Sequence, residues 1–181
     1  MTDSIFSQNY FEMFSIDVAT EVDLQQLNQK NRELQQQVHP DRFANGTEAE
    51  KREAMQKTSL INQAYNTLKN PVSRLQYMLD LNGVDMNAET DTSMDGAFLM
   101  EQMELREVIA DVRSQDDPLA TLERIASELK QKMTALIAEF DGEFKQGAFD
   151  QGRNIVRKLQ FINKAQHEVN ELTEQLEDEI L

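Results

Sequence analysis

This chain of 181 residues contains no cysteine, three prolines and six glycines. The lack of cysteine excludes disulfide bonds, thiolate metal sites, cysteine nucleophiles and zinc-finger modules. No apolar run comes near the length of about 20 residues that a membrane-spanning helix needs. The first residues have neither the basic segment nor the apolar stretch of a signal peptide. The sequence therefore predicts a soluble, cytoplasmic protein with no metal and no cofactor.

Basic residues are scarce beside acidic ones, with 18 Lys and Arg against 33 Asp and Glu and a net charge of −15. The excess falls mostly after residue 78, because residues 1–78 hold 8 basic and 10 acidic residues and residues 79–181 hold 10 and 23. A strongly negative surface repels nucleic acid and anionic membranes, so neither is an expected partner. Much of this charge serves solubility, but its asymmetry suggests two halves with different partners.

Helical periodicity runs through most of the chain, and strand-like alternation is nearly absent, which predicts an all-α fold. Helices are expected at about residues 9–14, 23–38, 49–68 and 72–79 and, after a break, at about 95–114, 118–140 and from 148 to near the end. Asp23 is a plausible N-cap, and the residues 141–147 are read as a loop. In the helix at 49–68, the residues expected to face inward are Met55, Ile61, Ala64, Tyr65 and Leu68.

The break lies between Leu81 and Gly96, where Gly, Asn, Asp and Thr interrupt the helical pattern. We therefore expect a first domain at residues 1–80, a linker at 81–95 and a second domain at 96–181. Each of the three helices of the second domain has one apolar face. Such helices, joined by short loops, bury those faces best as an antiparallel three-helix bundle.

The motif His39-Pro40-Asp41 stands where one helical pattern stops. The pattern before it repeats at spacings of 3, 4, 3 and 4 through Leu24, Leu27, Asn31, Leu34 and Val38. Since proline cannot continue a helix and restricts the residue before it, the imidazole and the carboxylate should be displayed on a turn. A catalytic or metal-binding pair is one interpretation, although the only other histidine is the distant His167. An ordinary helix-ending turn is another.

The helix expected at 95–114 has two unlike faces. At about 100° per residue, one narrow stripe contains Phe98, Gln102, Leu105, Ile109 and Val112. The opposite side holds Met100, Met103, Glu104, Glu107 and Asp111, with Leu99 between the two. Phe161 likewise lies off the apolar stripe of the last helix. Exposed apolar groups and adaptable methionines are typical of binding surfaces. The alternative is that Met100 and Met103 pack against the N-terminal domain or the linker.

The segment from Tyr10 to Leu79 resembles a J-domain, the helical module that activates ATP-hydrolysing heat-shock chaperones. The resemblance rests on "VHPDRF" at 38–43 and "INQAYNTLKNPVSRLQYML" at 61–79. The second half, with "GAFLMEQMELREVI" at 96–109 and "VRKLQFINKA" at 156–165, resembles the HscB family of J-domain co-chaperones, which serve iron–sulfur cluster biogenesis.

This resemblance implies an L-shaped, two-domain adaptor that is not itself an enzyme. Its J-domain would be an antiparallel helical hairpin with short flanking helices, and we expect the chain to act as a monomer. The implied partners are an HscA-type chaperone ATPase and, as client, an IscU-type iron–sulfur scaffold protein. The residues implied to bind the chaperone are His39, Pro40, Asp41, Arg42, Lys30 and Arg32. Those implied to bind the client are Leu99, Met100, Met103, Glu104, Glu107, Asp111 and Phe161.

Two features depart from the J-domain pattern. Asn31 stands eight residues before His39, where J-domains usually place an aromatic residue, so that an amide falls in the apolar seam and needs a hydrogen-bond partner. Glutamines at 35–37 stand where cations are common, which predicts docking that is weaker or tuned to one dedicated chaperone. Two other functions remain open: a J-domain adaptor for a different client, and a stand-alone helical enzyme that uses His39 and Asp41.

Overall fold

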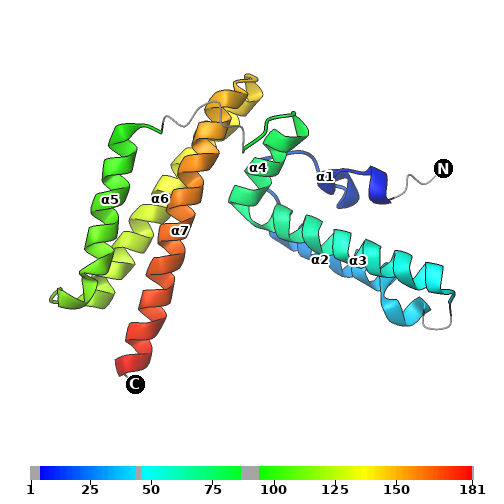
Figure 1. Ribbon diagram of the computed structural model, residues 1–181, viewed down its shortest axis with the longest axis horizontal. Helices are drawn as coiled ribbons and strands as arrows, with labels where there is room; N and C mark the ends of the chain where they lie inside the picture. The colour runs from blue at the N-terminus through cyan, green and yellow to red at the C-terminus, as the bar shows by residue number, and fades with distance from the viewer. Residues whose placement is uncertain (1–4, 44–45, 87–93, 181) are drawn as a thin grey trace. The chain divides into compact units, whose positions relative to one another are not determined.

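The structure, a computed structural model, describes residues 5–43, 46–86 and 94–180. Over these residues the chain is helical and contains no strand, as the periodicity predicts. Its contacts divide it into two compact units, residues 1–78 and 79–181, which are coloured from blue to green and from green to red in Figure 1. Of the linker expected at 81–95, residues 87–93 lie outside the described part of the chain. No described helix is long and apolar enough to cross a membrane.

The first unit is built around a hairpin of two long helices, α2 (Leu24–Val38) and α3 (Glu48–Lys69), which lie side by side in Figure 1. Before the hairpin come η1 (Ile5–Ser7) and α1 (Tyr10–Met13); η2 (Pro40–Phe43) lies within it, and α4 (Pro71–Leu81) follows. Asp23 caps α2 as predicted, because its carboxylate accepts the N–H groups of Gln25 and Gln26 at 2.8 and 3.2 Å. The fully buried core of this unit includes Phe11, Phe14, Leu27, Ile61, Leu68 and Leu75.

Arg74 fastens three parts of the first unit together. Its side chain is buried, and its guanidinium donates to the Thr20 carbonyl at 3.0 and 2.7 Å and to the Leu68 carbonyl at 2.6 Å. Burial lowers the pKa of Arg74, while the nearby Glu21 raises it. Because a guanidinium stays protonated in proteins, the buried charge of Arg74 is stabilised by these hydrogen bonds to the carbonyl oxygens of Thr20 and Leu68. It holds the segment before α2 against the end of α3.

The inward-facing residues of α3 are predicted correctly at Ile61, Ala64 and Leu68, which are fully buried, but Met55 was assigned wrongly. Met55 is 65% exposed, and Ala54 takes the inward position with 2% exposure. The buried residues 54, 61 and 68 recur every seven positions, which is two helical turns. Methionine is larger and more apolar than alanine, so the sequence pattern favours Met55 as the inward residue. The helical register of α3 instead points Ala54 toward the core.

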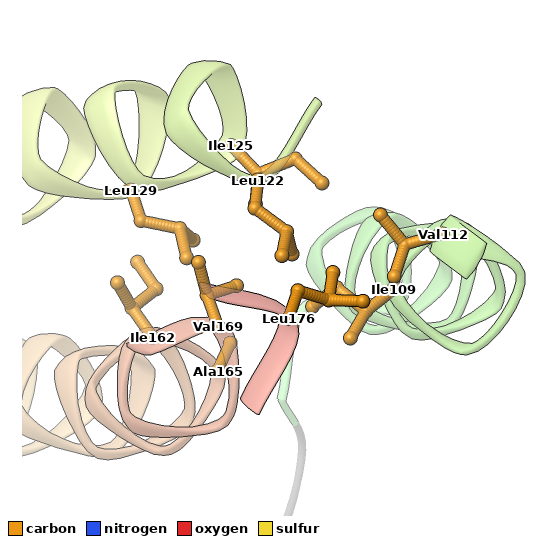
Figure 2. Close-up of a cluster of buried hydrophobic side chains, with 9 residues drawn as sticks. All are labelled: Ile109, Val112, Leu122, Ile125, Leu129, Ile162, Ala165, Val169 and Leu176. Atoms are coloured by element: carbon orange, nitrogen blue, oxygen red, sulfur yellow. The ribbon is translucent and has the colours of Figure 1, made fainter. Parts of the chain in front are cut away.

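The second unit packs α5 (Gly96–Ala110), α6 (Pro118–Lys145) and α7 (Phe149–Ile180) with the short η3 (Val112–Ser114). Figure 2 shows its core, in which side chains from the three helices and η3 converge. The core comprises Ile109, Val112, Leu122, Ile125, Leu129, Ile162, Ala165, Val169 and Leu176. At one end, the Arg113 guanidinium donates two hydrogen bonds to the Glu179 carboxylate at 2.8 and 3.0 Å, joining η3 to α7.

Helix α6 extends to Lys145, five residues beyond its predicted end at Phe140 and into the segment 141–147 that the sequence predicts to be a loop. Two contacts at a spacing of four residues support this extra turn. The rings of Phe140 and Phe144 stack with centroids 5.5 Å apart, and Lys145 pairs with Asp141 at 2.6 Å. The chain turns instead at Gly147, whose φ of +74° lies in the left-handed region that glycine adopts without strain.

Candidate partner-binding sites

The turn after α2 displays His39 to solvent. His39 is the C-cap of α2, with φ −55° and ψ 129°, and its carbonyl accepts the Arg42 N–H at 3.0 Å to close η2. The side chains of His39 and Asp41 are 57% and 91% exposed. Both side chains are therefore exposed on the turn, as predicted. The side chain of Pro40 lies outside the described part of the chain.

The imidazole of His39 is oriented by the residue two positions on. The Asp41 N–H donates to His39 Nδ1 at 3.3 Å, and an Asp41 carboxylate oxygen lies 3.5 Å from the same nitrogen. A neutral imidazole that accepts this bond carries its proton on Nε2. In that tautomer the exposed turn would present an Nε2–H donor beside an exposed carboxylate. No group of three or more potential metal-ligating His, Asp or Glu side chains occurs among the described residues, so the pair does not belong to a metal cluster there.

Arg42, Lys30 and Arg32 supply positive charge near the turn. Arg42 donates to the Gln36 carbonyl at 3.3 Å and so satisfies an acceptor in the last turn of α2. Lys30 lies 3.8 Å from Glu33, a separation at which an exposed ion pair is worth little, and Arg32 is exposed. Arg32 and Arg42 are exposed, and 31% of the Lys30 side chain is exposed, so all three cations are accessible to solvent.

Two of the residues that depart from the J-domain pattern, Gln35 and Asn31, lie between or beside the two helices of the hairpin. Gln35 donates to Asn62 at 2.6 Å, which links α2 to α3. Asn28 makes a second link, because it accepts a hydrogen bond from the Tyr65 hydroxyl at 2.6 Å. The Oδ1 atom of Asn31 is buried and has no hydrogen-bond partner among the described residues, which is the cost expected of an amide in an apolar seam.

The two faces of α5 separate as the helical spacing predicts. Gln102, Ile109 and, in the following η3, Val112 are buried. Met100 and Met103 on the other side are 65% and 64% exposed, and Leu99 is 37% exposed. Glu104, Glu107 and Asp111 are exposed too, and none of these carboxylates pairs with a cation among the described residues. Met100 and Met103 therefore do not pack beneath the rest of their own unit.

Phe161 extends this surface from α5 to α7. It is 36% exposed, and its ring meets that of Phe98 edge to face, with centroids 6.3 Å apart. We call the joint surface of the seven predicted residues the α5–α7 patch; its members are Leu99, Met100, Met103, Glu104, Glu107, Asp111 and Phe161.

Lys158 was missed by the sequence reasoning and lies beside the patch. Its ammonium group is 5.6 Å from the centroid of the Phe98 ring, a cation–π distance. An open pocket adjoins it, lined by Asp95, Ala97, Phe98, Met100, Glu101, Glu104 and Lys158. Lys158 precedes Phe161 by three residues, so the neighbour relation on a helix could have indicated it.

Comparisons with known proteins agree with this division of the chain. Residues 9–77 match the family described as the DnaJ domain, and residues 94–170 match the family described as the HSCB C-terminal oligomerisation domain. A co-chaperone protein HscB homolog of Shewanella loihica is 42% identical over 164 residues, covering 89% of this chain and 95% of that protein. The homolog of Colwellia psychrerythraea is 42% identical over 178 residues, covering 94% and 99%.

Solved structures give the same result. The chaperone HscB of Vibrio cholerae matches with a TM-score of 0.84 and 37% identity over 96% of this chain and 100% of that one. Human co-chaperone protein HscB matches with a TM-score of 0.80 and 29% identity over 91% of this chain and 81% of that one.

Proposed function

Since this chain belongs to the HscB family of J-domain co-chaperones, we propose that it binds an IscU-type iron–sulfur scaffold protein, delivers it to a dedicated HscA-type ATPase and stimulates ATP hydrolysis there. Family membership makes the chain a co-chaperone, not an enzyme, with an Hsp70-type chaperone as partner. We propose three things beyond this: the identity of the client, the stimulation of ATP hydrolysis and the location in the cytoplasm.

The observation that carries the client assignment is the chemistry of the α5–α7 patch. Met100 and Met103 expose adaptable apolar surface, and beside them lies a row of carboxylates that form no ion pair within the described part of the chain. Burying one such side chain against a partner contributes about 1.5–3 kcal/mol, whereas exposed ion pairs contribute little. The methionines and Phe161 would therefore supply affinity. The carboxylates would select a client whose apolar spot is bordered by Lys or Arg.

At the other unit, the turn bearing His39 and Asp41 would contact the chaperone ATPase. With the neutral imidazole protonated on Nε2, His39 and the nearby Arg42 would offer donor groups and Asp41 an acceptor group on a short, hydrogen-bonded turn. The co-chaperone changes no covalent bond in this scheme. It favours the hydrolysis-competent state of the ATPase because it binds that state better than the resting one.

Joining the two sites in one chain raises the local concentration of client at the chaperone. Once one partner is bound, capture of the other becomes effectively intramolecular, which increases avidity without a new contact. The proposal therefore requires that client and co-chaperone act together, and that neither replaces the other.

The decisive experiment measures the steady-state ATPase rate of the HscA-type chaperone alone, with this protein, with the scaffold and with both. We expect the increase over the basal rate with both proteins to exceed the sum of the two separate increases. Rates that merely add would contradict delivery. A pull-down with the scaffold beside an unrelated unfolded client then separates the proposed client from the alternative of an adaptor for a different protein.

A further inference from the structure

Every sulfur atom of this chain is a methionine thioether, because nine methionines are accompanied by no cysteine. Their exposure is very unequal. Met13 and Met78 are buried at 3% and 2%, whereas Met55, Met100 and Met103 are 65%, 65% and 64% exposed. Two of these three most exposed thioethers therefore lie in the α5–α7 patch.

We propose that Met100 and Met103 form a peroxide-sensitive modification site whose oxidation releases the client from the α5–α7 patch. This inference rests on the proposed function. The thioether sulfur attacks one oxygen of hydrogen peroxide, an S–O bond forms and the O–O bond breaks. The sulfur loses two electrons in becoming a sulfoxide, and the peroxide is reduced to one molecule of water. Methionine sulfoxide reductases reverse the change.

A sulfoxide at either position disfavours a tight apolar contact with a partner. Oxidation replaces an apolar group by a strong hydrogen-bond acceptor, which must keep a donor when it is buried. Glu104 and Glu107, four residues after Met100 and Met103, offer no donor when ionised, so a buried sulfoxide would have to draw a donor away from solvent, from Lys158 in the pocket beside Met100 or from Arg106. Met100 and Met103 are three residues apart and so are neighbours on the helix surface. One partner contact would therefore meet both sulfoxides.

The same distribution of sulfur leaves the chaperone-binding end unaffected. No methionine lies between Met13 and Met55, so the turn at His39 and the cations near it have no thioether among them. Oxidation should accordingly weaken client binding while the chaperone is still stimulated in the absence of client. A general loss of folding would remove both activities together.

The test begins with the whole protein, treated with graded hydrogen peroxide and freed of peroxide before it meets the scaffold. Peptide mass spectrometry should find Met55, Met100 and Met103 oxidised at doses that leave Met13 and Met78 intact. At such a dose the affinity for the scaffold should fall at least about tenfold. The client-free stimulation of the ATPase and the helical circular dichroism should stay at their untreated values.

Two variants identify the residues responsible, each compared with its own untreated sample. Met55→Leu should lose as much affinity on oxidation as the wild type. Met100→Leu/Met103→Leu should show the same affinity before and after peroxide, whatever that affinity is. Equal binding by oxidised and untreated wild type, or an undiminished loss in the double variant, would overturn this inference alone. If the untreated wild type fails to bind the scaffold, the proposed function falls and the inference with it.

Discussion

Phe98 and Phe161 meet edge to face, with ring planes inclined by 88° and centroids 6.3 Å apart. One ring belongs to the core side of α5, and the other is partly exposed on α7. Such a pair is typically worth about 0.5–1.5 kcal/mol beyond the area it buries. The contact fixes where Phe161 lies beside α5, so the α5–α7 patch depends on tertiary packing as well as on the face of one helix.

Replacing Met100, Met103 and Phe161 together with serine should weaken scaffold binding by at least about a hundredfold, because each loses apolar surface in the contact. Stimulation of the chaperone without client should persist. Titration calorimetry with the scaffold measures the first effect, and the ATPase assay measures the second. Met55→Ser is the matched control, since Met55 is as exposed as Met100 but lies on α3. A triple variant that binds like the wild type would show that the client site lies elsewhere.

Arg74→Leu should lower the free energy of unfolding of the first unit by about 3 kcal/mol or more. The substitution leaves the Thr20 and Leu68 carbonyls without the donors that the guanidinium supplies. Arg74→Lys should recover only part of this loss, because an ammonium cannot reproduce the planar fork of donors. Urea unfolding monitored by circular dichroism measures both. The exposed Arg52 gives the control, since Arg52→Leu should change the midpoint little.

Asp80 provides a test of how the free energy of unfolding depends on pH, because its raised pKa makes the group favour the folded state at low pH. Partial burial, and secondarily the nearby Asp85, raise the pKa of the Asp80 carboxyl above its ordinary value of 3.8. The folded state therefore binds a proton more readily than the unfolded state, so stability from this group is present at low pH and is lost as pH rises through the folded pKa. Asp80→Asn should stabilise the protein at neutral pH, by less than about 1 kcal/mol because the group is mostly exposed.

The advantage of Asp80→Asn should shrink as the pH falls through the raised pKa of the Asp80 carboxyl, because the wild-type group then becomes protonated. Urea midpoints of the two proteins across this range give the measurement. A constant difference at every pH would mean that the raised pKa does not contribute to stability. Asp95→Asn is not a suitable control, because the Asp95 carboxylate caps α5 by accepting the Ala97 N–H at 3.0 Å.

Sequence reasoning predicted what depends on local periodicity and chain chemistry. The all-α fold, the cap at Asp23 and the outward methionines of α5 follow from spacing and side-chain type, and the structure agrees with each. It failed where several signals competed. The glycine-containing segment 141–147 predicts a loop after Phe140, although the pairs Phe140–Phe144 and Asp141–Lys145 support a further turn of α6. The position of Lys158 over Phe98 is a tertiary contact, which one-dimensional periodicity does not contain.

Glutamine in place of His39 should abolish stimulation of the chaperone ATPase while the protein stays folded. His39 is exposed, and apart from its backbone carbonyl, its one described hydrogen bond is with the N–H of Asp41, so the free energy of unfolding should change by less than about 0.5 kcal/mol. Glutamine can bring an amide N–H near the position of Nε2, but it has no imidazole ring and no Nδ1 atom for the Asp41 N–H to hold in place. The variant should therefore lose its productive contact with the chaperone ATPase while it keeps its fold.

Three measurements on His39→Gln test this prediction. The ATPase rate with the variant should equal that of the chaperone alone, its urea midpoint should match the wild type, and its affinity for the scaffold should be retained, because the α5–α7 patch is untouched. His167→Gln is the matched control, since His167 is also exposed and also lies near a carboxylate, that of Glu171 at 3.4 Å, but on α7. If His39→Gln stimulated the ATPase as well as His167→Gln does, the turn after α2 would not be the chaperone-binding site.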